Sequence, residues 1–191
     1  MTDERDALDG SAVPAVAAVP VDLEPAAREL AALVRGVREE ALEDPTPCEK
    51  YTVRDLLRHI AELAVGLRVA ALKDLGPGTE RTPGTAMEEL PPDWREAVPH
   101  RLAELAAAWS DPAAWEGTTQ AGGVTLSGTE CGLVTLDELV VHGWDLARAT
   151  GQAFHSDETR LRAVHGLLAG AAEGGEEGGA DGGADGGPDG G

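Results

Sequence analysis

Between residues 21 and 172, apolar side chains recur every three to four positions, which is the period of amphipathic helices. The first such segment begins near Asp22, a favourable N-cap residue, with Pro25 in its first turn. The turn-forming segment 44–47 predicts its end. Its apolar positions have the spacing of one helix face: Leu30, Leu33, Val34, Val37 and Ala41.

The second segment has the clearest helical pattern in the chain. Thr52 and Asp55 have the spacing of a capping box, in which each side chain accepts a hydrogen bond from the other residue's backbone N–H. The glycine- and proline-containing segment 76–78 predicts where this helix ends. Its apolar positions form a continuous stripe: Val53, Leu56, Leu57, Ile60, Leu63, Ala64 and Leu67.

Three further helices are predicted in the remaining sequence. One ends near Trp109, with Leu102, Leu105 and Ala106 also facing inward and Pro99 in its first turn or at a kink. Another spans about 136–150 and stops at Gly151, and a weaker one covers about 157–172. The segment 110–132 is rich in Gly, Thr and Ser, so we expect an irregular loop or small hairpin there, with a length typical of a functional lid.

These elements predict an all-α fold, an up-and-down four-helix bundle with a loop or small hairpin before the last bundle helix. Aromatic residues make up only 3% of the chain, so the core must consist of aliphatic side chains, which favours helices over strands. We assign the bundle to residues 22–172. Residues 1–21 are expected to form a disordered leader, and the Gly-, Asp- and Glu-rich segment 173–191 a disordered tail.

The net charge of −20 narrows the range of partners. Such a surface repels nucleic-acid phosphates and anionic membranes, so we expect neither as a partner. Cys48 and Cys131 have no CxxC spacing, and no apolar run has transmembrane length. The sequence therefore predicts a cytoplasmic protein, and it is compatible with a homodimer.

Three polar residues of the predicted helix at 136–150 fall on one face. Glu138, His142 and Asp145 are spaced i, i+4 and i+7, which places them within an arc of about 60°. A Glu and a His one turn apart can both reach one cation, and helix bundles build carboxylate–histidine metal sites in this way. The apolar residues of this helix lie opposite: Leu136, Leu139, Val140 and Ala147.

Two structural interpretations compete with a metal site. Thr135 and Glu138 also have the spacing of a capping box, which would make Glu138 an N-terminal helix residue. A polar arc opposite an apolar arc is also typical of a solvated helix face. The Glu-x-x-x-His spacing alone does not decide between these interpretations.

His59 is the candidate for a third ligand. It lies on the flank of the apolar stripe, between Leu56 and Leu63, where it could reach a cleft between helices. A boundary histidine with a local hydrogen bond is the structural alternative. Together with Glu138 and His142 it would form a three-ligand site with open coordination positions, an arrangement that suits catalytic Zn²⁺ or non-haem Fe²⁺.

Two strings in the sequence resemble a known family. The first is Thr46-Pro47-Cys48 with residues 52–59 (TVRDLLRH), and the second is residues 138–151 (ELVVHGWDLARATG). Both resemble the mycothiol-dependent maleylpyruvate isomerase metal-binding domain, which belongs to the DinB-like superfamily. The residues 49–51 differ from the Pro-Gly-Trp that often follows in relatives.

The resemblance implies a DinB-like four-helix fold with a divalent metal, usually zinc, bound by His59, Glu138 and His142. Asp145 falls in the second string and is expected to orient a ligand from outside the coordination sphere. The family further implies mycothiol as a low-molecular-weight thiol cosubstrate and a small electrophilic substrate. The additional C-terminal domain of the full isomerase does not follow in this sequence, so its substrate is not transferred.

Three hypotheses follow for the function. The first is a metal- and thiol-dependent transferase or isomerase, with the segment 110–132 covering the substrate. The second is a binding protein with a structural metal and no turnover. The third is a metal-free interaction module whose polar arc is only a solvated face.

Overall fold

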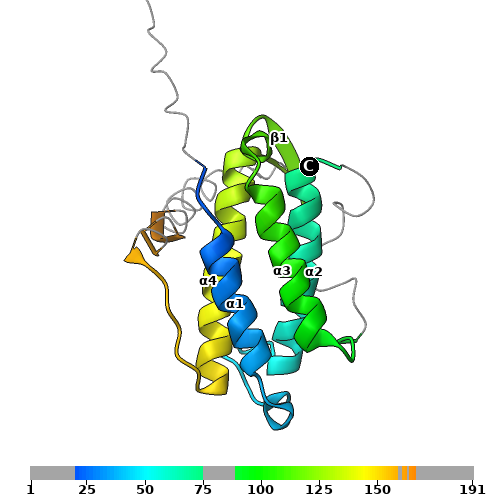
Figure 1. Ribbon diagram of the computed structural model, residues 1–191, viewed down its shortest axis with the longest axis vertical. Coiled ribbons are helices and arrows are strands. Elements are labelled where there is room, and N and C mark those ends of the chain that lie inside the picture. The colour runs from blue at the N-terminus through cyan, green and yellow to red at the C-terminus, as the bar shows by residue number, and fades with distance from the viewer. Residues whose placement is uncertain (1–19, 75–88, 159–160, 163, 167–191) are drawn as a thin grey trace, which may run out of the picture.

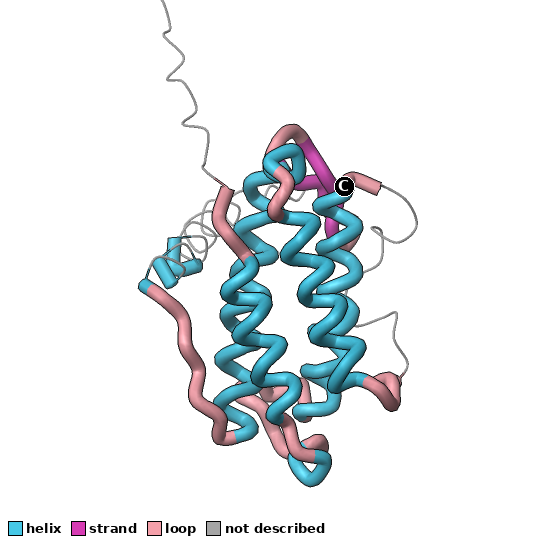
Figure 2. Tube along the Cα trace, in the orientation of Figure 1, coloured by secondary structure: helices cyan, strands magenta, loops and turns pink. Residues whose placement is uncertain are grey.

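Four long helices form the framework of the part of the chain that the computed structural model describes, residues 20–74, 89–158, 161–162 and 164–166 (Figure 1). They are α1 (Glu24–Gly36), α2 (Val53–Leu72), α3 (Trp94–Trp109) and α4 (Gly128–Thr150). Short 3₁₀ helices, η1 (Glu39–Ala41) and η2 (Pro112–Trp115), lie in the connections. A hairpin of β1 (Thr118–Ala121) and β2 (Val124–Ser127) precedes α4 (Figure 2). The predicted helical bundle with a small hairpin is confirmed.

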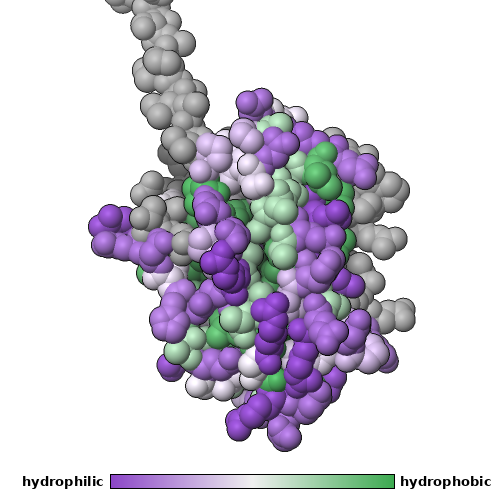
Figure 3. Space-filling model, in the orientation of Figure 1, coloured by the Kyte–Doolittle hydropathy of each residue, from purple (hydrophilic) through white to green (hydrophobic). Residues whose placement is uncertain are grey.

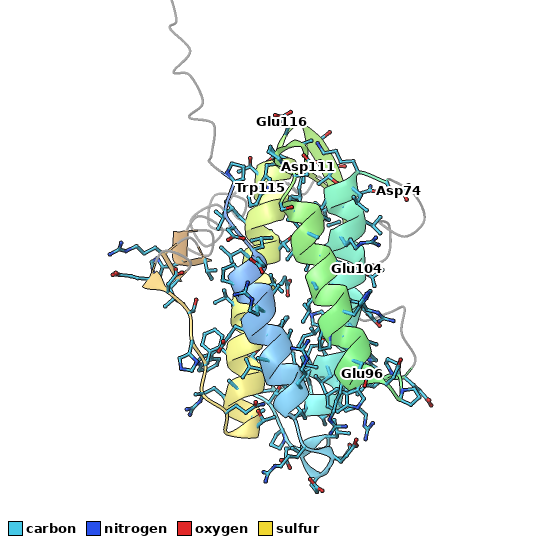
Figure 4. The ribbon with its side chains drawn as sticks, in the orientation of Figure 1. Asp74, Glu96, Glu104, Asp111, Trp115 and Glu116 are labelled. Carbon is cyan, nitrogen blue, oxygen red and sulfur yellow. The ribbon has the colours of Figure 1, made fainter. Side chains whose placement is uncertain are left out.

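The helices pack in the order α1, α3, α2, α4 around the bundle, so α2 contacts both α3 and α4. α2 and α3 run in the same direction, because Asp74 after α2 and Asp111 after α3 lie at one end of the bundle, whereas Glu96 lies at the other (Figure 4). α1 and α4 run the opposite way (Figure 1). The directions therefore do not alternate along the chain, and the predicted up-and-down order is wrong at the step from α2 to α3, which pack side by side and run parallel.

The two helices that carry the candidate ligands begin with capping boxes. Thr52 and Asp55 cap α2 as predicted. α4 is capped by Ser127 and Glu130 and therefore begins at Gly128, eight residues before the predicted start at 136. Local sequence thus defines the start of both helices.

The earlier start of α4 removes one interpretation of Glu138. Thr135 lies inside the helix, fully buried, where its hydroxyl donates a hydrogen bond to the Cys131 carbonyl at 2.8 Å. It is therefore not an N-cap, and the reading of Thr135 and Glu138 as a capping box is wrong. The C-terminal end of α4 is as predicted, because Gly151 has the left-handed φ of +67° that favours glycine.

The hairpin pairs its strands antiparallel from Thr118 opposite Ser127 to Ala121 opposite Val124. Gly122 and Gly123 form the turn with positive φ angles, which two-residue hairpin turns require. The buried hydroxyl of Thr119 donates to the Ala70 carbonyl, near the C-terminal end of α2. Ala70 is eleven residues beyond His59, about three helical turns away. The prediction that the segment 110–132 covers the site is therefore wrong.

Aliphatic side chains dominate the core, as the composition predicted. The stripe of α2 is buried, and Trp109 and Trp115 pack edge to face with their ring centroids 5.3 Å apart. On the face shown in Figure 3, alanines of α1 and α3 line an open cavity of about 450 Å³, bordered by Arg28 and Arg35. This cavity lies between α1 and α3, away from the facing sides of α2 and α4.

The boundaries of the first helix differ from the prediction. α1 begins at Glu24, whose N–H donates to the Asp22 carboxylate, and it ends at Gly36, so Ala41 lies in η1 instead. Of the predicted helix over 157–172, the described residues 158, 161–162 and 164–166 are helical. The predicted leader, except for residues 20–21, and the tail over 173–191 lie outside the described residues. Within the described residues, no helix combines the length and apolarity needed to cross a bilayer.

Candidate metal site

His59 lies on the flank of α2 that faces α4. The stripe residues beside it, Ile60 and Leu63, are buried in the core, and the His59 side chain is half-buried. Its ring nitrogen Nδ1 is fully buried and has no hydrogen-bond partner among the described residues. The local hydrogen bond expected of a boundary histidine is therefore missing at this nitrogen. A buried polar atom without a partner is unfavourable unless a water or a cation satisfies it.

Glu138 and His142 lie one turn apart on α4 and contact each other. The Nε2 atom of His142 lies 2.8 Å from Oε2 of Glu138. The side chain of His142 is 14% exposed and that of Glu138 is 29% exposed, so this pair lies at the edge of the core. The i, i+4 spacing alone directs both groups to the same side of the helix.

The structure brings His59 to this pair. One ligand atom from each of His59, Glu138 and His142 lies within 4.8 Å of the other two, and the three groups could together hold one metal ion. The two imidazole rings meet edge to face, with centroids 4.9 Å apart and an interplanar angle of 84°. Two neutral imidazoles and one carboxylate are donors that zinc and similar divalent ions prefer, so the residues fit such an ion.

Asp145 lies behind His142. Its Oδ2 atom is 3.4 Å from Nδ1 of His142, the ring nitrogen that does not face Glu138. Asp145 is buried, with 7% of its surface exposed. A carboxylate in this place accepts the Nδ1–H of the imidazole and leaves the lone pair of Nε2 for a ligand bond. The geometry thus places Asp145 beside His142, and its role in orienting a metal ligand stays a prediction.

The electrostatic surroundings of the two histidines differ. Burial lowers the pKa of His59, and the neighbouring His142 lowers it further, against the opposing effect of Glu138. Burial also lowers the pKa of His142, but its hydrogen bonds to Glu138 and Asp145 and their charges outweigh burial and raise it above the usual value. The charges of Glu138 and Asp145 thus affect the pKa of His142 more than the pKa of His59.

Two neighbours of the site were not singled out from the sequence. The Tyr51 ring lies 5.3 Å from the His59 ring, centroid to centroid. Glu62 is 9% exposed and follows His59 by one turn of α2. The sequence did contain a signal for Glu62, because its i, i+3 spacing from His59 places both residues on neighbouring parts of the helix surface.

The other candidate side chains lie elsewhere. His100 and His155 are exposed, and His155 contacts Glu29 at 3.3 Å. Cys131 is completely buried, and burial raises the pKa of its thiol to about 11. Cys48 is half-buried in the loop before α2, where the Thr46 hydroxyl donates to the carbonyls of both Cys48 and Tyr51.

Comparison with known proteins identifies relatives and a family for the chain. The chain is 32% identical over 133 residues to two proteins of Mycobacterium tuberculosis, the uncharacterized protein MT0763 of strain CDC 1551 and the uncharacterized protein Rv0738 of strain H37Rv. The alignment covers 66% of this chain and 64% of each relative. No solved structure matches the chain. The family model of the mycothiol maleylpyruvate isomerase N-terminal domain matches residues 23–147, which include α1 to α3 and most of α4 with all three candidate ligands, and the chain therefore belongs to this family of DinB-like, metal-binding helical domains.

Proposed function

We propose that this protein binds one divalent metal ion, zinc in the cell, and acts as a thiol-dependent transferase or isomerase on a small electrophile. The observation that carries the proposal is the convergence of His59, Glu138 and His142 to within 4.8 Å. Three protein ligands leave open coordination positions, which distinguishes catalytic from structural zinc sites. Mycothiol is the thiol that the family description suggests.

The chemistry supplied by a bound zinc ion is the stabilisation of a thiolate at neutral pH, the nucleophilic form of a thiol. The chain's own residues orient the ligands and supply negative charge at this site. Asp145 holds His142 with Nδ1 engaged and Nε2 directed to the site. Glu138 contributes a negative charge that partly offsets a divalent cation. The buried stripe of α2 beneath His59 excludes water from the core side.

The relatives from Mycobacterium tuberculosis are uncharacterized, and the chain aligns with less than two thirds of their length. The family description names an isomerase through its N-terminal domain only. The proposal therefore concerns the metal and thiol half of the reaction.

Metal analysis of the purified, untagged protein tests the site. We expect about one equivalent of zinc in the wild type and loss of most of it in the His59→Ala and His142→Ala variants. His100→Ala removes an exposed imidazole from α3 and should keep the metal. One equivalent of zinc in the His59→Ala, His142→Ala double variant would contradict the assignment.

A thiol titration then separates an enzyme from a passive metal-binding protein. Cobalt-substituted protein is titrated with mycothiol, and a new thiolate-to-cobalt absorption band is expected. His142→Ala should show no such band. A wild type that holds one equivalent of cobalt but gives no band with the thiol would support a metal-binding domain without thiol chemistry.

A further inference from the structure

The two histidines of the candidate site are held by different contacts. His142 lies between two carboxylates, with Nε2 2.8 Å from Glu138 and Nδ1 3.4 Å from Asp145. The Nδ1 atom of His59 is buried and has no hydrogen-bond partner among the described residues. A histidine that binds a metal needs a fixed ring, because its lone pair must point at the ion. The orientation of the His59 ring therefore depends on contacts other than a hydrogen bond at Nδ1.

Contacts between rings are the ones that His59 makes. Its imidazole meets the His142 ring edge to face, with centroids 4.9 Å apart, and the Tyr51 ring at a tilt of 43°, with centroids 5.3 Å apart. Aromatic pairs are favourable in such arrangements, at centroid distances of about 4.5–7 Å. His142 is itself a candidate ligand, whereas Tyr51 lies outside the set of three converging groups.

Tyr51 is anchored by the loop that precedes α2. Its backbone N–H donates to the Cys48 carbonyl at 2.9 Å, and its carbonyl accepts from the N–H of Thr46 at 3.2 Å and from the Thr46 hydroxyl at 2.8 Å. The side chain is half-buried and packs against the hydrophobic core. A ring with this backbone and this packing has few alternative positions, so it can restrain the neighbour that it contacts.

Helix capping alone does not account for the contact with His59. Tyr51 directly precedes the N-cap Thr52, and an apolar residue at that place commonly packs against the fourth residue of the helix, here Leu56. His59 lies three residues beyond Leu56, nearly one further turn along α2. The Tyr51 ring thus extends past the position that a cap requires and reaches the imidazole.

We propose that Tyr51 is a positioning residue of the metal site, whose aromatic ring holds the His59 imidazole in the orientation that lets it bind the ion together with Glu138 and His142. The inference rests on the proposed metal site. The role belongs to the ring rather than to the hydroxyl, because the contact joins the two rings. Neighbours just outside the coordination sphere typically change metal affinity by about 10- to 100-fold.

Cobalt binding to a set of full-length variants tests the proposal. Tyr51→Phe keeps the ring, whereas Tyr51→Leu and Tyr51→Met replace it with aliphatic side chains. Phe154→Leu is the matched control, since Phe154 is also a partly buried aromatic that packs against the core, on the side of α4 where Gly143 faces Leu33 of α1. Each protein is titrated with Co²⁺ alone. The d–d absorption band reports the geometry at the ion, and helical circular dichroism reports folding.

Wild type, Tyr51→Phe and Phe154→Leu should bind one equivalent of Co²⁺ with the same affinity and the same d–d band. Tyr51→Leu and Tyr51→Met should remain folded and bind one equivalent about tenfold more weakly, with an altered band, because all three ligands remain but His59 is no longer oriented.

Four results would overturn the role of Tyr51 alone. They are an unchanged affinity and band in Tyr51→Leu, an equal loss in Tyr51→Phe, an equal loss in Phe154→Leu, and the loss of helical structure in both aliphatic variants, which would assign Tyr51 to folding. A wild type that binds no Co²⁺ would instead overturn the metal site itself and this inference with it.

Discussion

His142 is the residue on which the candidate site depends most, because each of its ring nitrogens faces a different carboxylate. Nε2 lies 2.8 Å from Glu138, and Nδ1 lies 3.4 Å from Asp145. Spacings of four and three residues on a single helix produce this arrangement without help from another element. The imidazole is thus oriented before any ion arrives, which lowers the entropy lost on binding.

Asp145→Asn should weaken zinc binding by about 10- to 100-fold while leaving the stoichiometry at one, because the amide orients the ring without the negative charge. Competition with a chromophoric chelator measures this affinity. Glu29→Gln is the matched control, since Glu29 makes a similar contact with an exposed histidine, His155. Equal losses in both variants would show that the effect is not specific to the site.

At the scale of elements, both helices that carry ligands begin with capping boxes, so their starts are fixed locally. The Thr52 hydrogen bonds lower the pKa of Asp55, and those of Ser127 lower the pKa of Glu130. A carboxyl whose pKa is lower in the folded than in the unfolded state stabilises the fold above the unfolded pKa, about 4. This contribution disappears as the pH falls through the folded pKa.

The double variant Asp55→Ala, Glu130→Ala should therefore be less stable than wild type at pH 7, by about 1–2 kcal/mol in the free energy of unfolding. The difference should narrow as the pH falls from about 5 to 3. Urea titrations across this range measure it. A difference that does not change with pH would indicate that lost packing, and not the ionised caps, causes the destabilisation.

Two glycines show how differently helix positions tolerate a methyl group. A Cβ at Gly66 of α2 meets nothing within 4 Å, whereas a Cβ at Gly132 of α4 would lie 2.4 Å from the ring of Trp115. Gly66→Ala should stabilise the protein by about 0.5–1 kcal/mol through helix propensity. Gly132→Ala should destabilise it by about 1–3 kcal/mol through overpacking. Thermal unfolding compares them, and effects of the same sign would contradict the packing around Trp115.

At the scale of the whole molecule, the antiparallel contact of α2 and α4 determines which residues meet. His59 is the seventh residue of α2, Glu138 lies at the middle of α4, and His142 lies in its second half. Because α2 and α4 run in opposite directions, the first half of α2 lies beside the middle and second half of α4. A metal ion would thus link two helices that are distant in sequence.

Because such an ion binds only the folded bundle, zinc should stabilise the whole protein. At a free concentration 100 times the dissociation constant, the gain is about 2.7 kcal/mol. For a domain of this size that corresponds to a rise of roughly 5–10 °C in Tm, reversed by a chelator. Scanning calorimetry of wild type and His142→Ala measures the effect. A similar rise in the variant would place the stabilising ion elsewhere.

The sequence by itself determined the features that depend on neighbours along the chain. The α2 capping box, the apolar stripe and the shared face of Glu138, His142 and Asp145 could all be predicted, because helical geometry fixes spacings of three and four residues. The hairpin could be predicted only as one of two alternatives. The α4 start at Ser127 was missed, although Ser127 and Glu130 carry the same capping signal as Thr52 and Asp55.

Only the tertiary structure decided which distant elements meet. It placed His59 against α4 and packed the hairpin at the other end of α2. Sequence periodicity identifies the buried side of each helix, but the direction and neighbours of that helix depend on the packing of all the others. The resemblance to the isomerase domain supported His59 as a ligand in advance, whereas spacing alone favoured a boundary histidine.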